Sequence, residues 1–263
     1  MTAGPVPISV YMITKDNIRT VEKALQSVAG WADEIVAVDS GSTDGTVETL
    51  KKYTDRVSHR DWPGFRDQYQ HAQDLTKNRW VLFIDADEEI PPELAREIEG
   101  LFKNGEPEAD GYIAHRRTYY LGRLIKYGGW YPDFEIRLYR KDRGGWKGGL
   151  HAKVHVDGDV RELEHVYLHY NYKDIADQIR TVNLYSDIEA EEKDKANKEP
   201  SLFKMLLSPP FRFFRDYILK RGFLDGMPGL IIAVTTSYYI FAKYAKLWER
   251  RRVMRSSGKE ARE

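Results

Sequence analysis

Short apolar runs separated by polar turns dominate the first ninety residues. The run from Trp80 to Ile84 contains no Gly or Pro, as in a strand buried on both faces. Between such runs, apolar residues recur at helical spacing, for example Val21, Leu25 and Val28. The pattern predicts strands over residues 7–13, 34–39, 56–59 and 80–85, and helices over residues 18–28, 46–53 and 65–76.

Strands that alternate with helices favour right-handed crossovers and a mostly parallel sheet, so the predicted fold class is α/β. After Pro91 and Pro92 open another helix, the pattern changes. Three short strands joined by turns are expected over residues 111–117, 123–127 and 136–140, as an antiparallel extension of the sheet. A long polar helix with i,i+4 charge pairs follows over residues 173–196.

The last part of the chain differs in composition from the rest. Residues 198–200 (Lys-Glu-Pro) indicate a boundary between residues 1–198, the sheet domain, and residues 199–263. Within this tail, residues 227–242 are mostly apolar, but the stretch is too short and too rich in hydroxyl groups for a membrane span. Aromatic residues precede it and basic residues follow it, which favours a helical element lying in a membrane interface. The alternative is a helical hairpin that packs on the sheet domain.

The net charge of zero hides an asymmetry along the chain. Residues 201–255 hold eleven Lys and Arg against three acidic residues, a net charge of +8, so the remainder carries −8. A basic, aromatic-rich tail predicts a negatively charged partner, here a membrane surface with anionic lipid. The absence of cysteine excludes disulfides, thiol catalysis and Cys-based zinc sites. The N-terminus shows no signal-peptide pattern, and we expect no nucleic-acid partner.

Two aspartates follow the most strongly predicted strand. Asp85 and Asp87, separated by the small residue Ala86, stand where open α/β sheets bind ligands. Two hard oxygen ligands suit Mg²⁺ or Mn²⁺, which usually bind few protein carboxylates together with substrate phosphates. The alternative is a solvated acidic turn, because Glu88 and Glu89 continue the charge.

Two further loops are expected at the same sheet edge. Asp39 ends one strand and is followed by small residues, among them Gly41, which permits close backbone approach to a ligand. Thr14 and Asp16 follow the first strand. A capped turn without a ligand would explain either loop alone. Polar groups at three strand ends together favour a crevice that binds a nucleotide and a metal ion.

These motifs carry a family resemblance. Residues 14–17, 36–46 and 80–88 resemble the inverting family 2 glycosyltransferases of the GT-A fold. Further stretches are similar to the bacterial lipopolysaccharide-core β-1,4-glucosyltransferase subgroup, and they extend the resemblance over nearly the whole chain: residues 128–133, 137–140, 154–158, 168–170, 222–226 and 246–249. The predicted fold is therefore a GT-A fold with a C-terminal, membrane-associating helical segment.

The resemblance implies roles for residues on the donor side. It implies that Thr14, Asp16 and Asp39 contact the uridine. Asp85 is expected to contact the ribose or the diphosphate, and Asp87 to bind the metal ion. Asp85 and His169 are further candidate metal ligands. The alternative for His169 is a position in the hydrophobic core. Gly41 and Ala86 complete the donor loops, and Gln68 falls where the subgroup has a donor-contacting Gln. Asp67 and Tyr69 depart from the subgroup's basic residues, which leaves the donor sugar open.

The resemblance also exposes a departure on the acceptor side. An inverting transfer needs a general base on the acceptor hydroxyl, and the subgroup has a His-Glu pair whose Glu resembles that base. This chain has His151 and Ala152 there, and alanine cannot accept a proton. Either another group acts, with Asp133 and His151 as the candidates, or the chain has lost transfer activity, or the Glu was replaced to trap a complex.

Four residues are candidates for acceptor binding. Trp130 and Tyr131 are predicted to stack on sugars, and Arg137 and Arg140 to bind acceptor phosphates; packing residues and solvated strand charges are the alternatives. The sequence thus predicts a metal-dependent, inverting transfer of a hexose, glucose from UDP-glucose, to a lipid-linked saccharide such as lipopolysaccharide core. The expected location is the cytoplasmic face of the inner membrane. The alternatives are transfer to an isoprenoid-diphosphate-linked glycan and a membrane protein that only binds nucleotide sugars.

Overall fold

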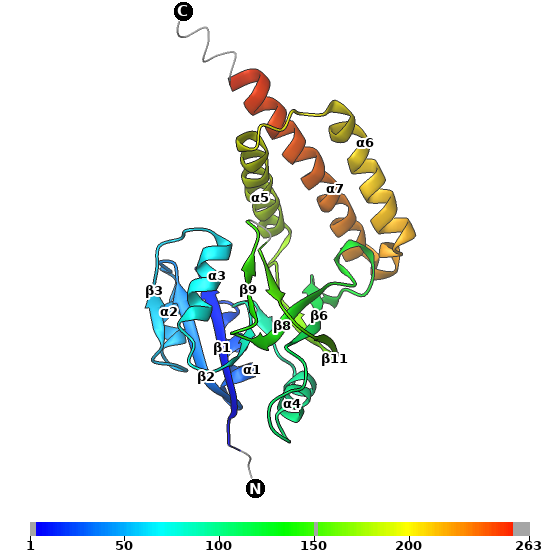
Figure 1. Ribbon diagram of the computed structural model, residues 1–263. Helices are drawn as coiled ribbons and strands as arrows, with labels where there is room; N and C mark the ends of the chain where they lie inside the picture. The colour runs from blue at the N-terminus through cyan, green and yellow to red at the C-terminus, as the bar shows by residue number, and fades with distance from the viewer. Residues whose placement is uncertain (1–3, 150–151, 255–263) are drawn as a thin grey trace, which may run out of the picture. The chain divides into compact units, whose positions relative to one another are not determined.

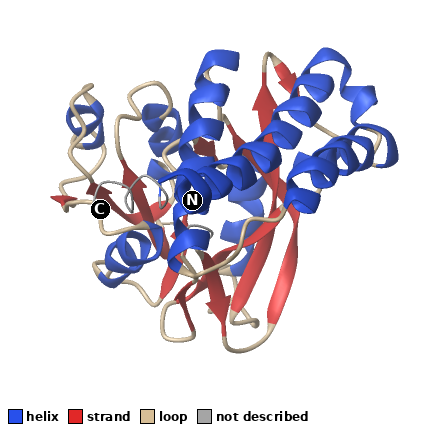
Figure 2. Ribbon diagram, turned by 90° about the horizontal axis from the view of Figure 1, so that it is seen from above, coloured by secondary structure: helices blue, strands red, loops and turns tan. Residues whose placement is uncertain are grey.

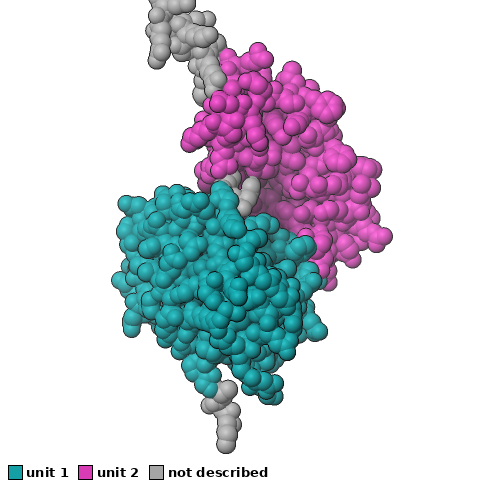
Figure 3. Space-filling view, viewed as in Figure 1, with its two compact units in different colours: residues 1–118, 133–170 teal, residues 119–132, 171–263 magenta. Residues whose placement is uncertain are grey.

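The computed structural model describes residues 4–149 and 152–254, which form two compact units (Figure 3). Unit 1 comprises residues 1–118 and 133–170, and unit 2 comprises residues 119–132 and 171–263. By its contacts the long polar helix thus belongs to unit 2. The predicted boundary at residue 198, between a transferase domain and a membrane-associating segment, is a functional division and stays a prediction.

Unit 1 is built around one mixed sheet (Figures 1 and 2). Its β1 pairs in parallel with β2 and β4, and β2 pairs in parallel with β3. Antiparallel β8 joins β4 to β6, which pairs in parallel with β11, and short β5 closes the sheet. The strands, in sheet order, are β3 (Val57–His59), β2 (Ala32–Asp39), β1 (Val6–Thr14), β4 (Trp80–Phe83), β8 (Phe134–Arg140), β6 (Gly111–Tyr120), β11 (Val160–His169) and β5 (Glu88–Glu89).

Both faces of this sheet are covered, which explains the uninterrupted apolar run of β4. Trp80 and Leu82 belong to the core under α1, α2 and α4, whereas Val81 and Phe83 belong to the core under α3 and the hairpin β9–β10. The predicted α/β fold with an antiparallel extension is therefore confirmed. The covering elements are α1 (Val21–Ala29), α2 (Thr46–Leu50), α3 (Phe65–Asp74), α4 (Pro92–Leu101), β9 (Gly144–Lys147) and β10 (Lys153–Val156).

Unit 2 is mainly helical. Its α7 (Gly226–Trp248) packs against both α5 (Ile175–Lys195) and α6 (Leu202–Phe213), and the short strand β7 (Arg123–Leu124) pairs with the end of β6. A buried polar contact joins the long helices, because Gln178 Nε2 donates to Thr235 Oγ1 at 2.8 Å.

A second polar contact between α5 and α7 centres on Glu189. Its carboxylate accepts from Tyr239 and forms ion pairs with Lys193, at 2.9 Å, and Lys243, at 3.0 Å. Burial raises the pKa of Glu189, but these donors outweigh it and lower the pKa to about 2.

Helix α6 and the turns after it expose many large apolar side chains. No residue of α6 is buried, and Phe203 is 71% exposed. In residues 4–149 and 152–254, no helix combines the length and the apolar character that crossing a bilayer requires. The exposed large apolar residues of this surface, called the apolar face below, are Leu202, Phe203, Leu206, Leu207, Phe211, Phe214, Ile218, Leu219, Phe223, Leu224 and Met227.

Candidate active site

The strands of unit 1 bring the predicted donor residues to one edge of the sheet. Thr14 ends β1 opposite Asp39, the end of β2, and Asp85 follows β4 at the same edge. Because β11 runs parallel to β6 and β8 runs antiparallel to β4, the end of β11 at His169 and the start of β8 at Phe134 lie at this edge too. One sheet edge thus collects residues that are up to 155 positions apart in the chain.

Asp39 folds the loop that follows it. Its Oδ1 accepts from the hydroxyls of Thr14, at 2.9 Å, and Ser42, at 2.5 Å, and its Oδ2 accepts from the backbone N–H groups of Gly41 and Ser42, both at 2.8 Å. Although burial raises the pKa of Asp39, these four hydrogen bonds lower it below its usual value. The carboxylate is therefore engaged within the protein, and the loop backbone that it holds faces the ligand edge.

The loop after β1 is tied to the same structure. Asp16 has a positive φ of 52°, its backbone N–H donates to Ser42 Oγ at 2.8 Å, and its Oδ1 accepts from Thr43 N at 2.8 Å. Gly41 has a φ of 86°, a conformation in which a side chain would be strained. The two predicted donor loops therefore form one hydrogen-bonded unit.

Gln68 lies beneath this unit. Its side chain is fully buried, and Nε2 donates to Ser40 Oγ at 2.9 Å and to the Arg60 carbonyl at 3.2 Å. Its Oε1 is buried without a hydrogen-bond partner in the structure. The structure thus places Gln68 under the loop that follows Asp39, where its bond to Ser40 supports that loop, and direct contact with the donor stays a prediction.

Asp85 is held in a tight turn after β4. Its backbone N–H donates to Glu88 Oε2 at 2.9 Å, and its Oδ1 accepts from the hydroxyl of Tyr69 at 2.5 Å. Burial and the negative charge of Glu88 raise the pKa of Asp85 to about 7. A bound cation would relieve this concentration of negative charge.

Asp87 contacts His169, the predicted partner from the end of β11. Their Oδ2 and Nε2 atoms are 3.3 Å apart, and the buried Ala86 sits between the two aspartates of the turn. Against the effect of burial, the charge of His169 lowers the pKa of Asp87, and Asp87 in turn raises the pKa of His169. The structure therefore joins the three predicted metal-site residues in one turn and one strand end.

Among the described residues, no group of three or more His, Asp or Glu side chains is placed so that it could hold a metal ion. Mg²⁺ and Mn²⁺ usually take one or two carboxylates and complete their coordination with substrate phosphates and water. Asp85 and Asp87 can supply that number of carboxylates, and His169 pairs with Asp87 beside them. The residues present fit a divalent ion that arrives together with a diphosphate.

Arg137 requires a correction. It was expected to bind an acceptor phosphate, but it is 2% exposed, and its two terminal nitrogens each bond a Glu88 carboxylate oxygen at 2.7 Å. Its guanidinium also lies 4.0 Å from the ring centre of Phe83. The side chain points from β8 into the protein because Glu88 provides the matching bidentate carboxylate. Arg137 supports the turn after β4 and is closed to an acceptor phosphate.

Arg140 also requires a correction. It pairs with Trp80, the first residue of β4, so it lies at the opposite sheet edge from Asp85. There its guanidinium forms ion pairs with Asp110, at 3.0 Å, and Asp142, at 2.7 Å. The antiparallel direction of β8 thus removes Arg140 from the acceptor side.

Three positions were considered for the general base: Asp133, His151 and Ala152. Asp133 Oδ2 accepts from Arg116 Nε at 2.9 Å and from a second nitrogen of the same guanidinium. Ala152 is half-buried and packs against the core cluster that includes Phe83 and Trp146. His151 lies outside the described residues.

Trp130 and Tyr131 belong to unit 2. Trp130 packs in a cluster with Tyr120 and Tyr172, with ring centres 5.3 and 5.7 Å apart. Trp130 thus has a packing role in its own unit, and sugar stacking by Trp130 and Tyr131 stays a prediction.

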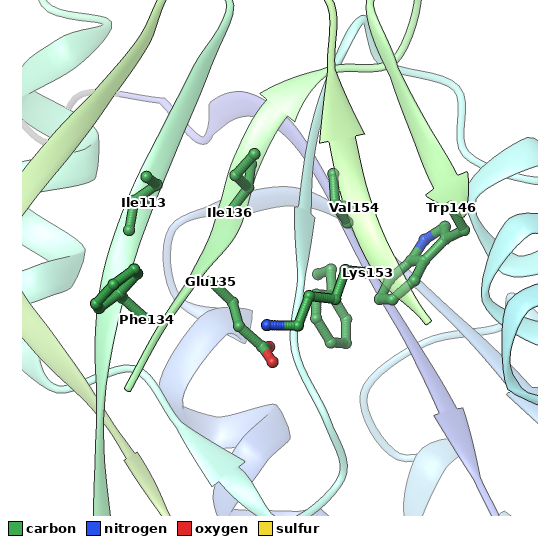
Figure 4. A pocket seen from close by; sticks show the side chains of 8 residues that line it. Ile113, Phe134, Glu135, Ile136, Trp146, Lys153 and Val154 are labelled. Atoms are coloured by element: carbon green, nitrogen blue, oxygen red, sulfur yellow. The ribbon is translucent and has the colours of Figure 1, made fainter. Parts of the chain in front are cut away.

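A pocket of about 130 Å³ opens in unit 1 between β8 and the hairpin β9–β10 (Figure 4). Its wall is mainly apolar, and the charged side chains of Glu135 and Lys153 point toward one another across it in Figure 4. The lining residues are Phe83, Ile113, Phe134, Glu135, Ile136, Trp146, Lys153 and Val154.

Sequence reasoning missed three residues of this region: Tyr69, Glu88 and Glu135. Tyr69 stacks on Trp146 with ring centres 4.1 Å apart while its hydroxyl holds Asp85. Glu88 was noted only as part of an acidic turn, yet it is 1% exposed. The role of Glu88 depends on its contact with Arg137 of β8. That contact can be recognised only when the pairing of β4 with β8 is known.

Comparisons with known proteins agree with this geometry. Residues 9–152 match the family described as Glycosyl transferase family 2. The chain is 31% identical over 260 residues to the lipopolysaccharide core biosynthesis glycosyltransferase LpsC of Rhizobium meliloti, covering 93% of each chain. It is 30% identical over 255 residues to an uncharacterized glycosyltransferase of Rickettsia conorii, covering 92% of this chain and 90% of that protein. In fold it is similar to the mannosyltransferase PcManGT from Pyrobaculum calidifontis, solved with GDP-Man and Mn²⁺, with a TM-score of 0.50 at 15% identity over 95% of this chain and 89% of that one.

Proposed function

This chain belongs to glycosyltransferase family 2, and from that premise we propose that it transfers a hexose, glucose from UDP-glucose, to a lipid-linked saccharide with inversion at the anomeric carbon. The relationship to LpsC supports lipopolysaccharide core as the acceptor. The main structural support for donor binding is the turn after β4. There two aspartates and His169 meet the preformed loops of β1 and β2 at one sheet edge.

In this proposal each donor residue has a task that its surroundings support. The backbone of the loop after Asp39 binds the nucleotide, and the buried Gln68 supports that loop through Ser40. Asp85, Asp87 and His169 hold a Mg²⁺ or Mn²⁺ ion, which when bound neutralises charge on the leaving diphosphate. Tyr69 and Glu88 keep Asp85 oriented for that task.

The proposed membrane location is supported by the apolar face. Five exposed Leu and Phe side chains lie on α6, and Lys204 and Arg212 lie on the same helix. Several exposed large apolar side chains on one element are typical of an interaction surface. Apolar side chains flanked by cations suit the headgroup region of an anionic membrane. We propose that α6 lies in the membrane interface, at the cytoplasmic face where a soluble donor meets a lipid acceptor.

The transfer is tested by assaying UDP release from UDP-glucose with Mn²⁺ and detergent-dispersed, core-truncated lipopolysaccharide. We expect acceptor-dependent release that EDTA abolishes and that Asp87→Ala reduces strongly. A panel of nucleotide sugars, screened by thermal shift, identifies the donor, since a ligand at a hundredfold excess over its Kd adds about 2.7 kcal/mol to stability. Stabilisation by UDP-glucose without any acceptor-dependent release would favour the second candidate, a membrane protein that only binds nucleotide sugars.

The membrane location is tested by vesicle flotation. The unaltered chain should float with vesicles containing phosphatidylglycerol and less with phosphatidylcholine alone. The double variant Phe203→Ser, Leu207→Ser should lose most of this binding, and Leu184→Ser, an exposed leucine of α5, serves as the matched control. Equal flotation of both variants would contradict the proposal. Dimerisation through the apolar face, seen by size-exclusion chromatography in detergent-free buffer, would point to a second copy as its partner.

A further inference from the structure

The pocket between β8 and the hairpin β9–β10 contains a carboxylate that the sequence analysis did not consider. Among the eight described residues that line it, Glu135 is the one carboxylate. Its side chain is 23% exposed, so it reaches solvent while its base lies in the wall of the pocket. We infer that Glu135 is the general base that deprotonates the acceptor hydroxyl; this inference rests on the proposed inverting transfer.

The first support is the position of Glu135 relative to the donor turn. Glu135 Oε2 accepts from Arg137 at 2.9 Å, and Arg137 in turn holds Glu88, which accepts from the backbone N–H of Asp85. Phe83, the last residue of β4, lines the same pocket. The pocket therefore adjoins the turn that carries Asp85, and its carboxylate is connected to that turn by a short chain of hydrogen bonds.

The second support is that, of the carboxylates at this edge, Glu135 is the one that lines the pocket. Asp133 accepts two hydrogen bonds from Arg116, and Glu88 is buried against Arg137. Asp85 and Asp87 face the donor in the proposed function. Glu135 also accepts a hydrogen bond from Arg137, but only through Oε2, and its side chain lines the pocket whereas that of Asp133 does not.

The third support comes from the hairpin opposite Glu135. Two residues of this hairpin strand, Lys153 and Val154, line the pocket, and the half-buried Ala152 precedes them. Lys153, the next residue, extends its ammonium toward Glu135 in Figure 4. A cation at the mouth suits an acceptor that carries a phosphate or a carboxylate near the reacting hydroxyl. The pocket thus offers an apolar wall, a cation and a base.

The step balances as a single displacement. The acceptor oxygen attacks the anomeric carbon of the donor hexose, and a new carbon–oxygen bond forms there. The bond from that carbon to the diphosphate oxygen breaks, and its electron pair leaves with UDP. The acceptor hydroxyl proton passes to Glu135, which later releases it to water.

The experiment compares Glu135→Gln with the unaltered chain, using UDP-glucose, Mn²⁺ and detergent-dispersed, core-truncated lipopolysaccharide. The amide keeps the size of the side chain and can still accept a hydrogen bond from Arg137, but it cannot take up a proton. We expect kcat to fall about 10²- to 10⁴-fold while the Kd for UDP-glucose stays unchanged. Glu108→Gln, which changes an exposed carboxylate that pairs with Arg161, is the matched control and should retain full activity.

A second variant protects the test against a merely structural effect. Ala152→Glu introduces a carboxylate directly before Lys153, a lining residue of the pocket, and in the Glu135→Gln background it should recover at least part of the lost kcat. A Glu135→Gln variant within threefold of the unaltered kcat would overturn the inference, as would a parallel loss of UDP-glucose binding. If the unaltered chain binds UDP-glucose but transfers nothing, the base assignment fails; if it binds no nucleotide sugar, the proposed function fails and takes the base assignment with it.

Discussion

The buried pair of Glu88 and Arg137 allows the sharpest test of the physical reasoning. Both side chains are almost fully buried, and they are joined by two hydrogen bonds of 2.7 Å. Glu88→Ala would leave the Arg137 guanidinium charged and buried without its main partner. Removing one member of a buried pair typically costs about 3–5 kcal/mol, because the remaining charge has lost both water and counter-charge.

The measurement is urea denaturation followed by circular dichroism, with the shift of the midpoint read at constant m value. The double variant Glu88→Ala, Arg137→Met should recover much of the loss, since it buries no unpaired charge. Glu106→Ala is the control. Glu106 pairs with Arg79, and because both side chains are about half exposed, we expect the unfolding free energy to fall by less than about 1 kcal/mol. Additive losses in the double variant, or a cost for Glu88→Ala no larger than that for Glu106→Ala, would refute the reasoning.

Three further predictions concern other parts of the molecule. The partners of Glu189 depress its pKa to about 2 from an ordinary 4.5, so its contribution to stability is complete above pH 5 and is lost as the pH falls toward 2. Urea denaturation should show Glu189→Gln about 2 kcal/mol less stable than the unaltered chain at pH 7, with the difference narrowed at pH 3 and closed near pH 2. Gly229→Ala places a Cβ 2.0 Å from the Gly222 carbonyl oxygen, so the melting temperature should drop by several degrees; an unchanged value would contradict the close approach. Tyr69→Phe removes the hydrogen bond to Asp85, so calorimetry should show Mn²⁺-dependent UDP binding weakened about 10-fold, with binding in the absence of Mn²⁺ unaffected.

The sheet and the donor edge were predictable from the sequence because local patterns determine them. Alternate residues of β1 and β4 enter the two cores, so both strands appear as continuous apolar runs. Parallel strands then bring their carboxyl ends to one edge without further information. This is why Thr14, Asp39 and Asp85 were expected together, and they are.

The acceptor side was harder to predict because it depends on strand direction and pairing. Arg137 and Arg140 are similar in the sequence, yet one lies inside the protein against Glu88 and the other at the far edge of the sheet. Neither outcome follows from the alternation within β8 alone. The pairing of β8 with β4 is a long-range contact, which no local pattern encodes.

The place of α5 was obscure for a different reason. Its buried positions are Gln178, Val182, Ser186 and Ala190, which recur every four residues but are small or polar. Such a stripe carries little hydrophobic signal, so the helix appears as a solvated charged element in the sequence. It is buried because α7 presents Thr235 and other small side chains to it.

The hydrogen bonds of Asp39 have a kinetic consequence. Since this carboxylate and that of Asp16 already fix the loops around Gly41, an arriving nucleotide finds its cradle assembled and has little chain entropy to remove. Association should therefore be a one-step encounter whose observed rate rises linearly with nucleotide concentration, without the plateau that a slow loop closure imposes. Asp39→Asn would turn an acceptor atom into a donor facing backbone N–H groups, and the same titration should then curve. In this protein a buried acid would govern how fast the donor binds by holding the loop that receives it.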